Sequence, residues 1–119
     1  MRKLIFVLSL LSAAASAQSF GPFQITGSQC ASVVTTQRAT ATYQVLGSWT
    51  GTIQPKVSVL GQSPVNTQTT PVASSTAQST VTANGAYFSR LSGYSSFSLC
   101  GNTVTNTATV YINVSSAGR

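Results

Sequence analysis

The sequence predicts an all-β protein: an antiparallel β-sandwich of jelly-roll or immunoglobulin-like type, with seven or eight strands and one disulfide. Three observations favour this fold class. Short segments of alternating polar and apolar residues recur along the chain, and they are rich in Val, Thr and Ser. Turn signals containing Gly, Pro or Asn separate these segments. Beyond the first seventeen residues, no segment has the three-and-four spacing of an amphipathic helix.

The chain begins with the three parts of a secretory signal. Residues 2–3 are basic, residues 4–11 are apolar, and small residues end in Ala15-Ser16-Ala17. The apolar run is shorter than the ~20 residues needed to span a membrane. We therefore expect residues 1–17 to be a signal peptide and residues 18–119 to be one β-sandwich domain. The domain is expected to be exported, to the periplasm or outside the cell, with no membrane association after cleavage; an uncleaved anchor is the alternative.

Alternating segments predict the strands of the domain. The clearest is Thr107 to Val114, where Ala108, Val110 and Ile112 share a face and Tyr111 lies on the other. One face is expected to pack in the core and the other to face solvent. In chain order, the expected strands are residues 20–26, 31–36, 40–46, 52–60, 86–91, 94–100 and 107–114, with at most a short strand near 71–73 in a long loop at 61–79.

Glycine, proline and asparagine indicate the connections. Gly47 to Gly51 favours a tight hairpin with Trp49 at or near its tip. Pro55 falls in phase with inward positions and removes a backbone donor, so its strand is expected to be an edge or to be bulged there. Asn84-Gly85 and Gly101-Asn102 indicate two further turns, the second separating the last two strands.

The chain contains no Asp, no Glu and no His, which excludes several chemistries. General acid–base catalysis uses His or carboxylates, and a Ser or Thr nucleophile would find only Lys56 as a non-aromatic base. Calcium and zinc sites need carboxylate, imidazole or several thiolate ligands. The four basic residues after the signal are scattered, so no nucleic-acid surface is expected. The sequence predicts no enzyme, no cofactor and no metal.

Cys30 and Cys100 are the only cysteines. Export would bring them into an oxidising compartment, which predicts one disulfide between them. Closing a loop of about seventy residues would stabilise the fold by about 4 kcal/mol in the chain-entropy model. The alternatives are a bridge between subunits and a reactive thiol pair, although no CxxC spacing supports the latter.

The order of motifs resembles a small β-sandwich domain common in bacteriophage and prophage structural proteins. The matching segments are GSWTGT (47–52), KVSVLGQS (56–63), TANGAYFSRLSGYSSFSL (82–99) and TNTATVYINVSS (105–116). The resemblance implies a virion-associated or tail-appended module that acts in assembly or adhesion and carries no catalytic residues. The signal peptide favours a secreted relative, or a virion protein exported before assembly.

Two functions remain open at this point, with a secreted inhibitor or toxin-like domain as a weaker third. The first is a structural protein that assembles with copies of itself or with other virion or surface proteins. The second is a module that binds surface glycans, since aromatic faces stack on sugar rings and amides bond hydroxyls. Its candidate residues are Trp49, Tyr87, Tyr94 and Tyr111. Packing of these aromatics in or around the core is the alternative. An exposed strand edge would favour assembly, and a concave patch with exposed aromatics would favour glycans.

Overall fold

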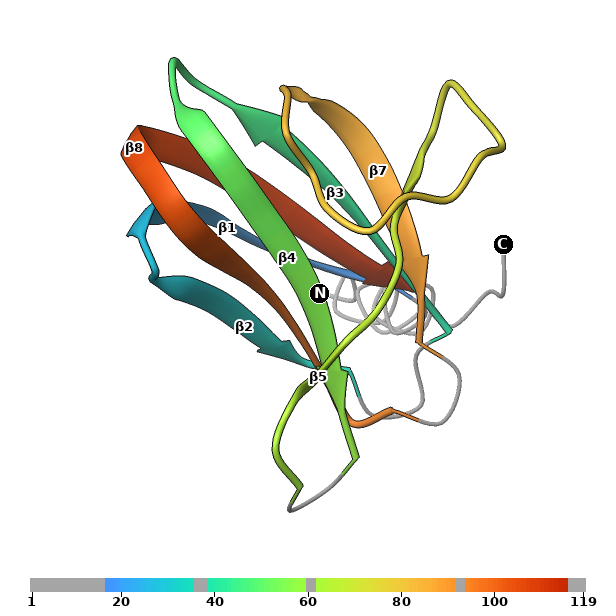
Figure 1. Ribbon diagram of the computed structural model, residues 1–119. Coiled ribbons are helices and arrows are strands. Elements are labelled where there is room, and N and C mark those ends of the chain that lie inside the picture. The colour runs from blue at the N-terminus through green and yellow to red at the C-terminus, as the bar shows by residue number, and fades with distance from the viewer. Residues whose placement is uncertain (1–16, 36–38, 60–61, 92–93, 116–119) are drawn as a thin grey trace, which may run out of the picture.

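The computed structural model describes residues 17–35, 39–59, 62–91 and 94–115, which form eight antiparallel strands (Figure 1). The described residues include no helix that is long and apolar enough to cross a membrane. The strands are β1 Ala17–Gly27, β2 Cys30–Val34, β3 Thr40–Leu46, β4 Thr50–Ser58, β5 Val65–Asn66, β6 Thr70–Pro71, β7 Gly85–Arg90 and β8 Ser96–Ser115.

The long C-terminal strand β8 organises the sheet. Its first half pairs with β2 on one side and β4 on the other, and its second half pairs with β1 and β3. The sheet curls around β8 into a half-barrel (Figure 1). We call its two sides the β4 wall (β2, β4, β5 and the first half of β8) and the β3 wall (β1, β3, β6, β7 and the second half of β8).

Three segments bend together where the walls meet, and we call this region the corner. It comprises residues 27–29 from the end of β1 to the start of β2, residues 47–51 from the end of β3 into the start of β4, and residues 101–106 within β8. In β8, Thr103 and Asn106 have positive φ values of 56° and 65°. A β-carbon on Gly101 would lie 2.6 Å from the Gly27 carbonyl oxygen, so the backbones approach too closely for a side chain. Positive φ angles at Thr103 and Asn106 and the absence of a side chain at Gly101 therefore allow the sheet to turn.

Alternation along the strands places the core between the two walls. In β3, Ala41, Tyr43 and Val45 point inward, and in β4 Ile53 and Val57 do so. The remaining buried hydrophobic residues are Ile25, Ala31, Val33, Val81, Tyr87, Leu91, Phe97, Leu99, Val104, Ala108, Val110, Ile112 and Val114. Burial of this apolar surface is the main stabilising term of the fold.

The two sides of the half-barrel have different edges. On one side, short β5 and β6 cover parts of β4 and β7, and Ile53 forms an isolated bridge with Val81, with both backbone N–H···O distances 2.9 Å. On the other side, β1 and β2 pair only with β8 among the described residues. Among the described residues, the long free strand edges of the sheet are therefore those of β1 and β2.

The structure confirms an all-β antiparallel fold with eight strands and one disulfide. Two predicted connections were wrong. Residues 94–100 and 107–114 were expected to be separate strands, but the chain bends at Gly101-Asn102 while its pairing continues, so both belong to β8. Residues 47–51 do not form a hairpin, because β3 and β4 each pair with β8 and not with each other. Most of the predicted signal peptide, residues 1–16, lies outside the described residues.

Candidate interaction surfaces

The four aromatic candidates lie in different places. Tyr87 is buried, its hydroxyl donates a 2.7 Å hydrogen bond to the Ala83 carbonyl, and burial raises its pKa. Trp49 and Tyr94 are half-buried and pack against the core. Only Tyr111 is well exposed, at 45%. The four aromatics therefore do not form one ligand platform.

Trp49 has a structural partner at the corner. Its indole Nε1 donates a 2.7 Å hydrogen bond to Asn84 Oδ1, and Asn84 Nδ2 donates a 2.8 Å bond to the Gly47 carbonyl. These bonds join the turn before β7 to the connection between β3 and β4. One of the four side chains proposed to stack on a sugar thus links two turns of the fold.

Tyr111 lines a shallow hollow on the outer face of the β3 wall, which we call the tyrosine hollow. Its volume is about 460 Å³. Outward positions of β3 and β8 supply Gln44 beside Tyr111 and Thr42 beside Asn113, since these residues are directly paired. Asn113 Nδ2 also donates a 2.9 Å hydrogen bond to Ser19 Oγ on β1. The hollow combines one aromatic side chain with amide and hydroxyl groups.

A second hollow, the arginine hollow, lies on the same outer face and shares Thr42 with the first. It has a volume of about 420 Å³ and is lined by Thr40, Thr42, Val72, Phe88 and Arg90. The Arg90 guanidinium carbon lies 6.0 Å from the centre of the Phe88 ring, within cation–π range. Thr40 faces Arg90 across β3 and β7. This hollow therefore places a cation beside hydroxyl groups.

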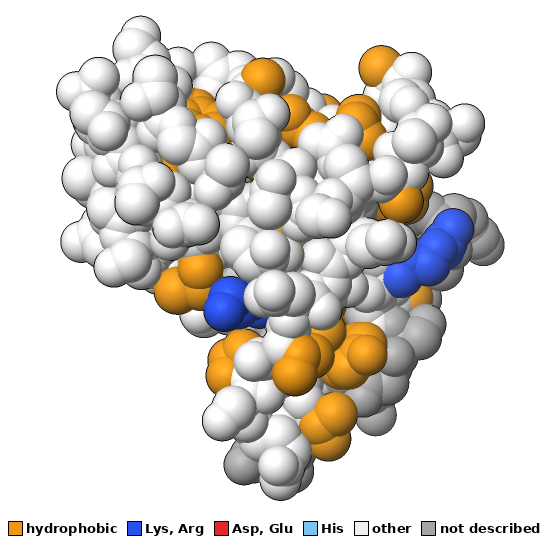
Figure 2. All heavy atoms as spheres, in the orientation of Figure 1, with side chains coloured by type: hydrophobic (Ala, Val, Ile, Leu, Met, Phe, Trp, Pro, Cys, Tyr) orange, Lys and Arg blue, Asp and Glu red, His pale blue; other side chains and the backbone are white. Residues whose placement is uncertain are grey.

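A groove runs between the free edges of β1 and β2, and we call it the β1–β2 groove. Its volume is about 570 Å³, and it is lined by Gln18, Phe20, Phe23, Ser32, Val33 and Val34. Val34 is 69% exposed, although it stands in a strand. In Figure 2 hydrophobic side chains gather at the lower end of the molecule, where β4 ends and β5 begins in Figure 1. Val59 follows β4 and Val65 begins β5, and they are exposed by 51% and 55%.

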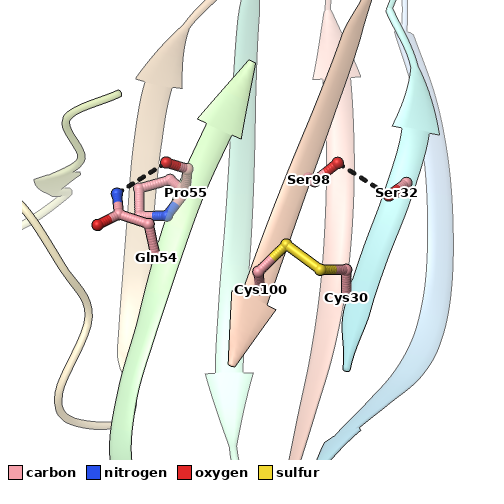
Figure 3. The surroundings of a disulfide bond; sticks show 6 residues. All are labelled: Cys30, Ser32, Gln54, Pro55, Ser98 and Cys100. Carbon is pink, nitrogen blue, oxygen red and sulfur yellow. Dashed lines mark hydrogen bonds between the residues drawn. A yellow bond between two sulfur atoms is a disulfide. The ribbon is translucent and has the colours of Figure 1, made fainter. Parts of the chain in front are cut away.

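The predicted disulfide joins directly opposed residues of neighbouring strands (Figure 3). Cys30 begins β2 and pairs with Cys100 of β8, just before the corner, and both point to the outer face of the β4 wall. Two residues along, Ser32 and Ser98 share a 2.8 Å hydrogen bond on that face. The bridge fastens β2 to β8 from outside the core.

Sequence reasoning missed the arginine hollow and the β1–β2 groove. One signal for the groove was available: in Val33-Val34, two neighbouring strand residues cannot both point inward, so one valine must be exposed. The arginine hollow had no such signal, because Thr40 and Arg90 are fifty positions apart in sequence and meet only through the β3–β7 register. Tyr111 was predicted to be outward and is outward.

The fold is one that prophage-derived proteins also carry. The SPBc2 prophage-derived protein YomS superposes with a TM-score of 0.73 at 17% identity, over 82% of this chain and 91% of YomS. The PBSX exported protein XepA superposes with a TM-score of 0.70 at 12% identity, over 82% of this chain and 38% of XepA. This chain thus spans less than half the length of XepA. No protein-family profile matches the sequence, and no curated protein sequence matches it significantly.

Proposed function

We propose that this chain is a non-catalytic, exported structural protein of phage or prophage origin, and that it assembles with further copies of itself through the β1 and β2 edges. The observation that carries the proposal is the pair of free edges beside the β1–β2 groove. Unpaired N–H and C=O groups of an edge strand can pair with a strand of another chain. A neighbouring β1 edge would supply such a strand.

The groove offers apolar contact in addition to backbone pairing. Phe20 and Phe23 are only partly buried, although they pair with the core residues Ile112 and Val110. A second copy seated here would cover both rings and the exposed Val34. Each Å² of apolar surface that is removed from water stabilises a contact by about 25 cal/mol. Pro22 lacks a backbone donor, so pairing is expected on either side of the β1 bulge rather than across it.

Composition and fold support the remaining parts of the proposal. A chain without Asp, Glu or His lacks the usual groups for proton transfer, which agrees with a role in binding rather than catalysis. The expected signal peptide and the likeness to an exported PBSX protein favour export. A largely uncharged surface of hydroxyl and amide side chains also repels neighbouring copies little (Figure 2).

Sedimentation velocity across a range of concentrations tests assembly. We expect the exported protein to form dimers or larger species, and Val34→Lys to shift it towards monomer by placing a charge at the groove. Val72→Lys is the matched control, because Val72 is also exposed, at 55%, but lies beside β7 on the opposite side of the half-barrel. A wild-type protein that stays monomeric at millimolar concentration would contradict self-assembly.

A second candidate, glycan binding, is favoured by the tyrosine hollow. We propose that the Tyr111 ring stacks on a sugar while Gln44 and Asn113 bond its hydroxyls. Isothermal titration against surface oligosaccharides should then give binding that Tyr111→Ala weakens by about tenfold or more. Thr109→Ala removes a half-buried outward side chain of the same strand and should leave binding unchanged. Equal affinities for wild type and Tyr111→Ala would exclude this site.

A further inference from the structure

We propose that the arginine hollow binds the carboxylate of an acidic glycan, held by the guanidinium of Arg90 and the hydroxyl of Thr40. The inference rests on the second candidate function and names the class of sugar. It begins with charge: the sequence has six basic residues and no acidic one, so no side chain of the chain can neutralise Arg90. Any carboxylate paired with this exposed guanidinium therefore comes from a chain terminus or from another molecule.

Thr40 supplies the second observation. It is only 3% exposed, and its Oγ1 has no hydrogen-bond partner among the described residues. Buried hydroxyls are nearly always paired, because an unpaired one loses its bonds to water without replacement. Thr40 nevertheless lines the arginine hollow. Because its Oγ1 is closed to solvent, the Thr40 side chain would rotate towards the hollow on binding, and an acceptor oxygen there would then give this hydroxyl the partner it lacks.

The sheet register brings the two groups together. Thr40 and Arg90 are directly opposed in the β3–β7 pair, so their β-carbons are about 5 Å apart on the same face. Phe88, two residues before Arg90, lies beneath the guanidinium and holds it over the sheet. A guanidinium binds a carboxylate through two parallel N–H···O bonds. One carboxylate can therefore accept from Arg90 and from Thr40.

Continuity with the tyrosine hollow favours a sugar as the carrier of the carboxylate. Thr42 lines both hollows, so one bound chain can occupy both. One sugar ring would then stack on Tyr111, while the acid group of another sugar residue of the same oligosaccharide binds Arg90. Val72 and Phe88 would contact the apolar C–H groups of the ring.

Titrations with paired probes test the inference. The probes are oligosaccharides of galacturonate, of mannuronate and of hyaluronan, each compared with its neutral methyl ester at physiological salt. At least one acidic form should bind about tenfold or more tightly than its ester. Arg90→Gln should abolish this preference. Lys56→Gln removes the same charge from the outer face of the β4 wall and should keep it.

Thr40→Val gives a second test, in which two measurements should change in opposite directions. Valine matches the shape of threonine without its unpaired hydroxyl, so the melting temperature should rise by about 4 °C or more while affinity for the acidic sugar falls. Unchanged affinity in this variant, or equal losses in Arg90→Gln and Lys56→Gln, would overturn the inference. If the acid and ester forms bind equally well through Tyr111, glycan binding still holds and only the carboxylate site is overturned. Absence of binding by every probe would overturn both.

Discussion

Tyr43 shows how one buried polar group is accommodated in this core. Its side chain is 1% exposed, and its ring centre lies 6.0 Å from that of Tyr87 and 5.4 Å from that of Phe97, which belongs to the opposite wall. Its hydroxyl hydrogen-bonds with Thr69 and, at 3.1 Å, with Ser89. Ser89 in turn donates to the Gln68 carbonyl at 2.9 Å. The network attaches the segment before β6 to the centre of the sheet.

Burial raises the pKa of Tyr43 from 10.0 to about 12, which predicts a loss of stability at alkaline pH. The unfolded chain releases this proton near pH 10, whereas the folded protein keeps it until about pH 12. The contribution of Tyr43 to the free energy of unfolding is therefore fully present below pH 10 and falls by about 1.4 kcal/mol per pH unit between pH 10 and 12. Urea denaturation at pH 8 to 11 measures this slope.

Tyr43→Phe is the control for this prediction. It keeps the ring, and Ser89 keeps its bond to Gln68 while Thr69 keeps one to the Phe88 carbonyl, so the loss at neutral pH should be about 1 kcal/mol. The variant should lose less stability above pH 10 than the wild type. Parallel pH profiles for the two proteins would contradict the assignment of the slope to Tyr43.

At the scale of elements, the corner depends on glycines that tolerate both its backbone angles and its close approaches. Gly51 has φ +115°, and a β-carbon there would lie 2.7 Å from the Thr103 carbonyl oxygen. Gly51→Ala should destabilise the protein by about 3 kcal/mol or more in chemical denaturation. Gly27→Ala is the comparison, because its φ is +65° and no atom lies within 4 Å; it should lose only about 1 kcal/mol. Equal losses would show that close approach does not matter at the corner.

Alternation predicted the elements well, and turn signals predicted their connections poorly. The strand at 40–46 matches β3, and the inward face of residues 107–114 is buried as expected, because period-two patterning follows directly from burial on one face. The glycines at 47–51 predict a hairpin, and Gly101 predicts a turn. The same residue type also permits a strand to bend without losing its partner, and local sequence does not distinguish the two uses.

The candidate sites divide in the same way. Tyr111 could be predicted as outward from its own strand, whereas the burial of Tyr87 and the bond from Trp49 to Asn84 depend on contacts between elements. The pairing of Thr40 with Arg90 follows from register, which a single sequence without a short hairpin loop leaves open. The exposure of a candidate residue could thus be predicted in part, whereas which candidate residues lie close together could not.

At the scale of the whole molecule, the disulfide constrains a loop of 70 residues while lying outside the core. Replacing both cysteines by serine should lower the free energy of unfolding by about 4 kcal/mol, a large part of the 5–15 kcal/mol of a small domain. The β-rich circular dichroism spectrum should persist, because no core contact is removed. Reductant should destabilise the wild type and leave the double variant unchanged. A wild type with the same melting temperature in reductant would contradict this prediction.

β8 follows all the other strands in chain order, and this order also determines when folding can begin. Among the described residues, β1 and β2 have no partner strand except β8, so the first part of the domain stays unpaired until the last twenty residues of the sheet are made. Such pairing between distant segments is slow to form. A polypeptide whose early strands cannot pair until a late strand emerges is one that a secretion channel can thread in extended form. If the chain is exported as proposed, the strand that completes the half-barrel would therefore also delay folding until it has itself been translocated.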